Sequence, residues 1–194
     1  MKNKLRIIGG DWRSRQISFV DAPGLRPTPA RVRETLFNWL QYDISGKQCL
    51  DLYAGSGALG FEAASRGAKA VVQVESNVHA CRSLRDNVVV LSANAITIVQ
   101  SDVLRYLEND ALVFDVVFLD PPFGEDLVIQ TCQKLEENGW LAKHARIYVE
   151  TERFFDFSRG AAMPENWRQL KSKTAGEVGY HLFERSLTLC GISL

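Results

Sequence analysis

The chain has 194 residues, 46% of them hydrophobic, with 23 basic and 23 acidic side chains and a net charge of zero. This length favours one domain, which we divide into a basic N-terminal hairpin and loop (1–30), a core (31–186) and a tail (187–194). No apolar run is long enough for a signal peptide or a membrane span, and the cysteines and histidines form no metal-binding pattern. We therefore expect a cytoplasmic protein without a metal site or a disulfide framework.

Charge is distributed unevenly along the chain. Residues 1–35 contain eight basic and three acidic side chains, a net charge of +5, so the remainder carries −5. Such segregation is common where an otherwise acidic enzyme contacts a phosphate backbone. A basic surface that is merely solvated is the alternative. The side chains that we expect to contact a polyanion are Arg6, Arg13, Arg15, Arg31 and Arg33.

The first elements form an extension before the core. Residues 5–8 and 15–20 alternate between apolar and polar side chains, which predicts a hairpin that turns at Gly9, Gly10 and Asp11. Residues 21–30 contain three prolines and a glycine and are predicted to be a loop. Apolar side chains at helical spacing then predict a helix over 31–42.

Beyond residue 46, short apolar runs alternate with amphipathic segments. The runs at 48–54, 70–76, 95–101 and 114–120 predict strands, and the segments at 59–67, 78–91, 103–110 and 126–141 predict helices. A further strand is expected at 145–152, followed by an antiparallel pair at 167–176 and 178–186. This alternation predicts an α/β fold with a mostly parallel seven-stranded sheet, helices on both faces, and ligands at the carboxyl ends of the strands.

A glycine-rich stretch joins the first core strand to the next helix. Gly55, Gly57 and Gly60 form a Gly-x-Gly-x-x-Gly motif, which lets a ligand approach the backbone closely. Glu75 ends the second strand, where a carboxylate can accept hydrogen bonds from both ribose hydroxyls of a nucleoside. Asp51 would oppose the pyrophosphate of a dinucleotide but would suit a ligand with an ammonium and a sulfonium group. Together these residues predict a site for S-adenosylmethionine.

Acidic residues also follow the third and fourth strands. Asp102 can accept a hydrogen bond from an adenine amine, and it is equally suited to cap the helix that follows it. Asp120 begins the stretch Asp-Pro-Pro-Phe, which in isolation could be no more than a strand end and a rigid turn. Residues near these positions or before the first core helix are also expected to contact the cofactor. They are Thr28, Tyr53, Ala54, Ser76 and Val103.

The Asp-Pro-Pro-Phe stretch suits methyl transfer to an exocyclic amine, whose lone pair is delocalised into the ring. The Asp120 carboxylate and the Pro121 carbonyl could accept the two N–H bonds and direct the lone pair at a sulfonium methyl group. Pro122 helps to hold that carbonyl rigidly, and Phe123 offers its ring to an unstacked base. The expected catalytic residues are therefore Asp120, Pro121, Pro122 and Phe123.

Other motifs accompany these, namely RIIGG (6–10), LRPTPARVRETLFNWL (25–40) and ENGWL (137–141). With DLYAGSGALG (51–60) and DPPF (120–123), they make residues 6 to about 185 resemble the RsmD family of bacterial methyltransferases. The resemblance implies a Rossmann-like class I methyltransferase fold and S-adenosylmethionine as cofactor. It also implies methylation of a guanine N2 in 16S ribosomal RNA. We expect the RNA to lie within an assembling small subunit and the enzyme to be a monomer. The family often has an acidic residue where this chain has Ala30.

Two other functions would use the same residues. A methyltransferase of DNA, of a small-molecule amine or of another RNA base (adenine N6) would have the same pocket. The resemblance nevertheless favours guanine, and the sequence contains no separate target-recognition domain. A non-catalytic RNA-binding module is the other alternative, which the intact Asp120 to Phe123 stretch disfavours.

Overall fold

The computed structural model describes residues 2–20, 27–124, 127–157 and 163–186; most of the predicted loop and the whole tail lie outside these ranges. Seven strands form one sheet, and two more pair separately. The strands are β1 (Lys2–Arg6), β2 (Gln16–Val20), β3 (Gln48–Leu52), β4 (Ala70–Glu75), β5 (Ile96–Gln100), β6 (Phe114–Leu119), β7 (Leu141–Glu152), β8 (Trp167–Ala175) and β9 (Val178–Arg185). The helices are α1 (Ala30–Trp39), α2 (Ala58–Ser65), α3 (Val78–Leu91), α4 (Val103–Tyr106) and α5 (Leu127–Glu137).

The large sheet confirms the predicted α/β class. Its order is β5-β4-β3-β6-β7-β9-β8, with parallel pairing from β5 to β7 and antiparallel pairing on both sides of β9. The chain runs from β3 outward to β5 and then returns to β6 on the other side of β3. This reversal creates a switch point at the carboxyl ends of β3 and β6, where folds of this kind bind ligands.

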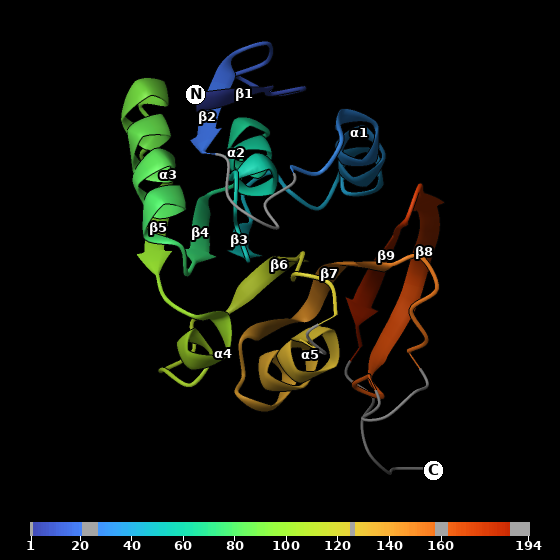
Figure 1. Ribbon diagram of the computed structural model, residues 1–194. Coiled ribbons are helices and arrows are strands. Elements are labelled where there is room, and N and C mark those ends of the chain that lie inside the picture. The colour runs from blue at the N-terminus through green and yellow to red at the C-terminus, as the bar shows by residue number, and fades with distance from the viewer. Residues whose placement is uncertain (1, 21–26, 125–126, 158–162, 187–194) are drawn as a thin grey trace, which may run out of the picture.

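Helices cover both faces of the sheet (Figure 1). The β1–β2 hairpin, α1, α2 and α3 lie on one face, and α4 and α5 lie on the other. Alternate residues of β6 point into the two resulting cores: Val116 and Phe118 into the first, Val117 and Leu119 into the second. Because both faces of this strand are buried from Val116 to Leu119, that part of its sequence is a continuous apolar run.

The predicted elements are correct in type, with errors at their ends. The helix predicted over 126–141 is too long, since α5 ends at Glu137 and Gly139 adopts a positive φ of 80°. A glycine in this conformation commonly follows a helix end. The chain can then enter β7 at Leu141, four residues earlier than predicted. The helix predicted over 103–110 is likewise shorter, because α4 ends at Tyr106.

The first strand of the hairpin also differs from the prediction. It spans Lys2–Arg6 rather than residues 5–8, and its pairing ends where Arg6 lies opposite Gln16. Beyond that point the amides of Ile8 and Gly9 donate to the two carboxylate oxygens of Glu62 on α2, at 2.9 and 2.8 Å. Ile7 still exchanges backbone hydrogen bonds with Arg15 and Ser14, and a side chain of the core binds the next two amides of the hairpin.

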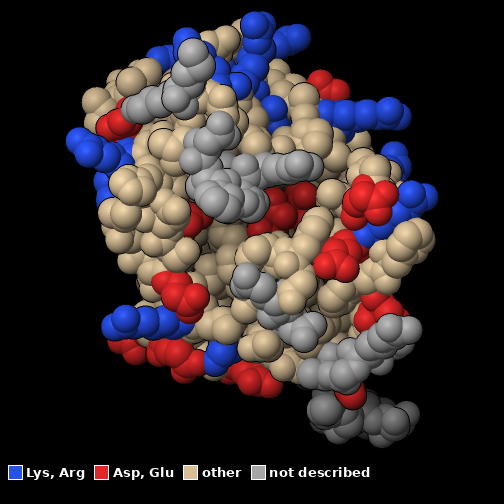
Figure 2. Space-filling view, viewed as in Figure 1, with Lys and Arg blue, Asp and Glu red and all other residues tan. Residues whose placement is uncertain are grey.

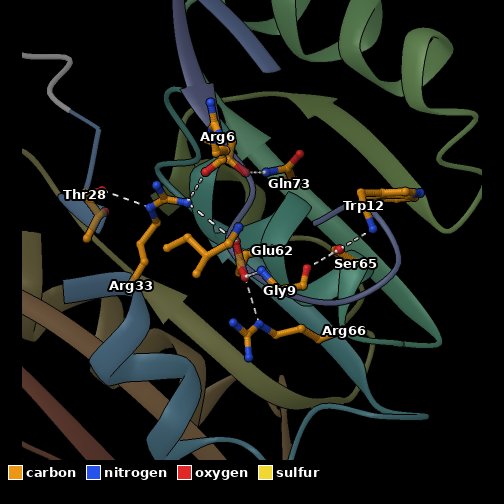
Figure 3. Close-up of polar contacts among 11 residues, drawn as sticks. Arg6, Gly9, Trp12, Thr28, Arg33, Glu62, Ser65, Arg66 and Gln73 are labelled. Carbon is orange, nitrogen blue, oxygen red and sulfur yellow. Dashed lines mark hydrogen bonds and ion pairs between the residues drawn. The ribbon is translucent and has the colours of Figure 1, made fainter. Parts of the chain in front are cut away.

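More polar contacts hold the hairpin against the core. Ser65 Oγ accepts a hydrogen bond from the Trp12 amide (2.9 Å) and donates one to the Gly9 carbonyl (2.6 Å) (Figure 3). Asn87 on α3 accepts from the Ser18 amide and donates to the Ser18 carbonyl, at 2.9 and 2.8 Å. The hairpin is thus a fixed extension of the core.

A buried ionic network lies at the centre of this contact (Figure 3). Glu62 is fully buried, and its carboxylate lies 3.5 Å from Arg33 Nη1 and 2.8 Å from Arg66 Nε. Arg33, only 3% exposed, also donates to the carbonyls of Thr28 and Arg6, each at 3.1 Å. Burial lowers the pKa of Arg33, and the adjacent Glu62 opposes that shift. The pair joins the hairpin, α1 and α2.

Removing the carboxylate should therefore destabilise the protein strongly. Glu62→Ala leaves the Arg33 guanidinium buried without its partner, and breaking such a pair costs about 3–5 kcal/mol. Urea unfolding followed by circular dichroism measures the loss. Glu137→Ala, at an exposed position at the end of α5, is the control and should change stability by less than about 0.5 kcal/mol. Equal stabilities of the two variants would contradict the role given to Glu62.

Candidate active site

The glycine-rich loop lies between β3 and α2, at the switch point. Gly55 and Gly57 have φ values of 51° and 77°, which favour glycine. A Cβ atom on Gly57 would also lie 2.5 Å from a Leu84 methyl and 2.8 Å from the Phe61 ring. The loop is thus a tight turn against α2 and α3, and no larger side chain fits at Gly57.

Glu75 joins this loop to the end of β4. Its carboxylate accepts hydrogen bonds from the amides of Gly55 (2.8 Å) and Asn77 (2.7 Å) and lies 3.5 Å from Ser76 Oγ. The side chain is 9% exposed. The structure therefore brings together the predicted cofactor residues Gly55, Glu75 and Ser76, although they are separated in the sequence.

Asp51 supports the loop from below. It lies within β3 rather than at its end and is 2% exposed. One carboxylate oxygen accepts from the Gly60 amide (2.9 Å) and from Gln73 Nε2 (2.8 Å). Burial raises the pKa of Asp51 to about 7, against the opposing effect of these hydrogen bonds. The side chain is thus directed at the protein's own backbone, and its direct contact with a cationic ligand stays a prediction.

The remaining predicted cofactor residues surround the loop. Tyr53, with a φ of 61°, places its hydroxyl 2.9 Å from Thr131 Oγ1. The Ala54 amide donates to the Val74 carbonyl at 2.9 Å. Asp102 is exposed after β5 and caps α4 by accepting from the Arg105 amide at 2.9 Å, with the adjoining Val103 buried. The capping role of Asp102 is therefore confirmed, and its contact with an adenine amine stays a prediction.

Asp120 lies beside a second carboxyl group that the sequence reasoning missed. Because β6 and β7 pair with Leu119 opposite Val149, the residues that follow, Asp120 and Glu150, occupy adjacent positions. Thr28, buried just before α1, lies close to both carboxyl groups, and its place in the cofactor site stays a prediction.

The environment of the pair raises the pKa of both carboxyl groups. Burial, the neighbouring Glu150 and then Asp51 hold the pKa of Asp120 well above its usual range, and the Thr28 hydrogen bond opposes this. Burial raises the pKa of Glu150 to about 7, although hydrogen bonds from Tyr148 and Thr28 lower it. Raised carboxyl pKa values are typical of groups that accept or donate protons in catalysis.

The loop after Asp120 presents an aromatic ring. Pro121 is buried, Pro122 is exposed, and the Phe123 side chain is 46% exposed. Phe123 lines a hollow of about 160 Å³ whose wall also includes Leu127 and Phe155. An exposed aromatic side chain beside an apolar hollow can receive a planar ligand.

Basic side chains gather on the hairpin. Figure 2 shows Lys and Arg along the upper edge of the molecule, and carboxylates at the bottom of a central hollow. Four of the five predicted arginines, Arg6, Arg13, Arg15 and Arg31, are exposed. The prediction that Arg33 contacts a polyanion is wrong, because this side chain is buried against Glu62. It belongs to the ionic network between the hairpin and the core.

The part of the chain that the structure describes contains no group of three or more His, Cys, Asp or Glu side chains that could hold a metal ion. No helix in that part is long and apolar enough to cross a membrane.

Comparisons with known proteins agree on one family. A model of the family described as conserved hypothetical protein 95 matches residues 5–184. Ribosomal RNA small subunit methyltransferase D of Escherichia coli K12 is 45% identical over 94% of this chain and 90% of its own. The protein of the same name from Haemophilus influenzae is 47% identical over 94% and 95%. A solved structure of E. coli yhhF has a TM-score of 0.85 at 43% identity and covers 95% of this chain and 99% of its own.

Proposed function

Since this chain belongs to the RsmD family of ribosomal RNA methyltransferases, we propose that it methylates the exocyclic N2 amine of one guanine in 16S ribosomal RNA. The observation that carries the proposal is the position of Asp120. Its carboxyl group follows β6 at the switch point, with the glycine-rich loop of β3 on one side and Glu150 on the other. The carboxyl group that would accept hydrogen bonds from the amine and the loop that would bind the nucleoside therefore lie at the same edge of the sheet.

The residues around the loop fit S-adenosylmethionine as the methyl donor. Gly55 and Gly57 allow the tight turn of the loop at the end of β3, and Glu75 ends β4 in the position suited to ribose hydroxyls. Asp102 and Val103 follow the next strand, where an adenine would lie. When bound, this cofactor supplies a methyl group on a positively charged sulfur. The acidic surroundings of the loop suit a cation and disfavour the pyrophosphate of NAD.

Asp120 and Pro121 would prepare the target amine. The Asp120 carboxylate and the Pro121 carbonyl accept its two N–H bonds, so that the nitrogen lone pair is no longer held in conjugation with the ring. Because the pKa of Asp120 is raised, its carboxylate is also a stronger base than an exposed aspartate. It can therefore accept the proton that the nitrogen loses.

Phe123 and the basic hairpin would bind the substrate. A base that leaves its helix can stack on the exposed Phe123 ring, as in other enzymes that act on flipped bases. The exposed arginines of the hairpin would contact the phosphates of the surrounding RNA. The relatives are named for the small ribosomal subunit, which favours a substrate in the assembling subunit and therefore a cytoplasmic enzyme. We also expect the enzyme to be a monomer.

The catalytic assignment can be tested by removing the carboxylate. Asp120→Ala should fold and bind S-adenosylmethionine and RNA, because it also removes the repulsion between Asp120 and Glu150. Single-turnover transfer should fall about 100- to 1,000-fold, as for the loss of other transition-state hydrogen-bonding groups. The assay uses tritiated S-adenosylmethionine and RNA from a strain that lacks the enzyme, followed by nucleoside analysis.

The matched variant is Phe123→Ala, which should instead weaken capture of the base by about 1–3 kcal/mol. Saturating RNA should restore part of the methyl-transfer rate of Phe123→Ala, but it should not restore the rate of Asp120→Ala. Near wild-type transfer by Asp120→Ala would refute the mechanism, and label in N6-methyladenosine rather than N2-methylguanosine would refute the substrate.

The cofactor assignment predicts a loss of affinity on changing Glu75. Glu75→Ala should weaken S-adenosylmethionine binding by about 1.5–3 kcal/mol, the range for hydrogen bonds to a charged group. Calorimetric titration measures it, with Glu137→Ala as a control that should bind normally. Unchanged affinity in a folded Glu75→Ala protein would remove this carboxylate from the site.

The hairpin should contribute salt-dependent affinity for RNA. Changing Arg13 and Arg15 to Gln should reduce the slope of log affinity against log salt by about 0.7–0.9 per lost phosphate contact. Changing Lys171 and Lys173 to Gln, both exposed on β8, is the matched control and should leave the slope unchanged. Equal slopes for both double variants would show that the hairpin arginines are only solvated.

A further inference from the structure

Two carboxyl groups meet behind the proposed catalytic centre, at the ends of adjacent strands. Glu150 is 3% exposed and follows Val149, which pairs with Leu119 next to Asp120. Thr28, which is 5% exposed, lies close to both groups in the segment before α1. The strand register therefore places Asp120 and Glu150 side by side, with Thr28 next to both.

Every element packed around this unit adds acidic or neutral groups. Tyr148, on the same face of β7, donates its hydroxyl to Glu150 Oε1 at 2.8 Å. Asp51 approaches from β3, and Tyr180 approaches Tyr148 from β9. Among the described residues, neither Asp120 nor Glu150 forms an ion pair with a lysine or an arginine. A buried carboxyl group and a half-buried one beside it, without a cation, cannot both ionise readily near neutral pH.

We propose that Glu150 is a positioning residue for methyl transfer, which lies beside Asp120 and shares one proton with it. Glu150 does not need to contact the substrate, because it acts on the basicity and orientation of Asp120. The assignment rests on the proposed function, and it adds to it a residue that neither the sequence motif nor the glycine-rich loop contains.

The proton balance of the reaction gives the pair its role. The amine nitrogen forms a bond to the methyl carbon while the carbon–sulfur bond breaks, and the sulfur keeps that electron pair. The nitrogen must then lose one proton. A carboxyl pair that holds one proton and one negative charge can accept this second proton, become neutral, and later release one proton to water. No other reactant is required.

Glu150→Gln tests the proposal, since it keeps the shape of the side chain and removes its acidity. Without the Glu150 charge the pKa of Asp120 should fall, so the acidic limb of the single-turnover pH profile should move about 1 unit to lower pH. The plateau rate should fall about 10- to 100-fold, as for other residues that orient a functional group. Affinity for S-adenosylmethionine, measured by calorimetry, should not change.

Thr28→Val is the second variant and should act in the opposite direction. The Thr28 hydrogen bond lowers the pKa of both carboxyl groups, so its loss should move the acidic limb to higher pH. Glu177→Gln, exposed in the turn between β8 and β9, is the control and should leave the profile in place. An unchanged limb in both Glu150→Gln and Thr28→Val would overturn the proposal.

A measurement on the protein alone separates this inference from the proposed function. The pKa of Glu150 is about 7 in the folded protein, against about 4.3 in an unfolded chain. The folded state therefore holds a proton that the unfolded state loses, and stability falls as the pH rises between these values. Glu150→Gln should reduce that slope by up to one proton. An unchanged slope would refute the shared proton, whereas wild-type protein that methylates no ribosomal RNA would refute the proposed function only.

Discussion

The pairing of β6 between β3 and β7 is the constraint on which the site depends. Leu119 lies opposite Leu52 on one side and Val149 on the other, so the chain leaves all three strands at one level. The glycine-rich loop, Asp120 and Glu150 are the immediate consequences. A shift of β6 by one residue would turn Asp120 to the other face of the sheet and place an apolar side chain at the centre.

Helix α2 connects this site to the hairpin. At its beginning the Gly60 amide is held by Asp51, and near its end Glu62 and Ser65 hold the backbone of the hairpin. The helix spans only Ala58–Ser65. The proposed RNA-binding surface and the proposed cofactor loop are therefore attached to the same short rigid element. This explains why Arg33, although it belongs to the basic segment, is buried: its charge fixes that attachment instead of facing solvent.

Sequence patterns predicted the strands well because β3, β4 and β6 are buried apolar runs, and they located the site because acidic residues and glycines interrupt those runs. They failed where a side chain's role depends on a distant partner. Glu150 sits on an alternating strand like any polar residue, and only the β6–β7 register places it beside Asp120. Arg33 carries the same charge as its exposed neighbours, and only Glu62 from α2 distinguishes it.

The carboxyl cluster is unfavourable for stability and useful for the proposed reaction for the same reason. The burial of Asp51 and Glu150, with Asp120 close to both, raises the proton affinity of all three groups, which disfavours the folded state at high pH. In the proposed reaction the positive charge moves from the sulfur to the target nitrogen as the methyl group is transferred, and it is lost when that nitrogen gives its proton to the pair. A nearby cation lowers a carboxyl pKa, so the proton affinity of the pair must rise once that charge is lost. The rise comes at the step in which the nitrogen releases its proton, and an exposed carboxylate, screened by water, would show little of it.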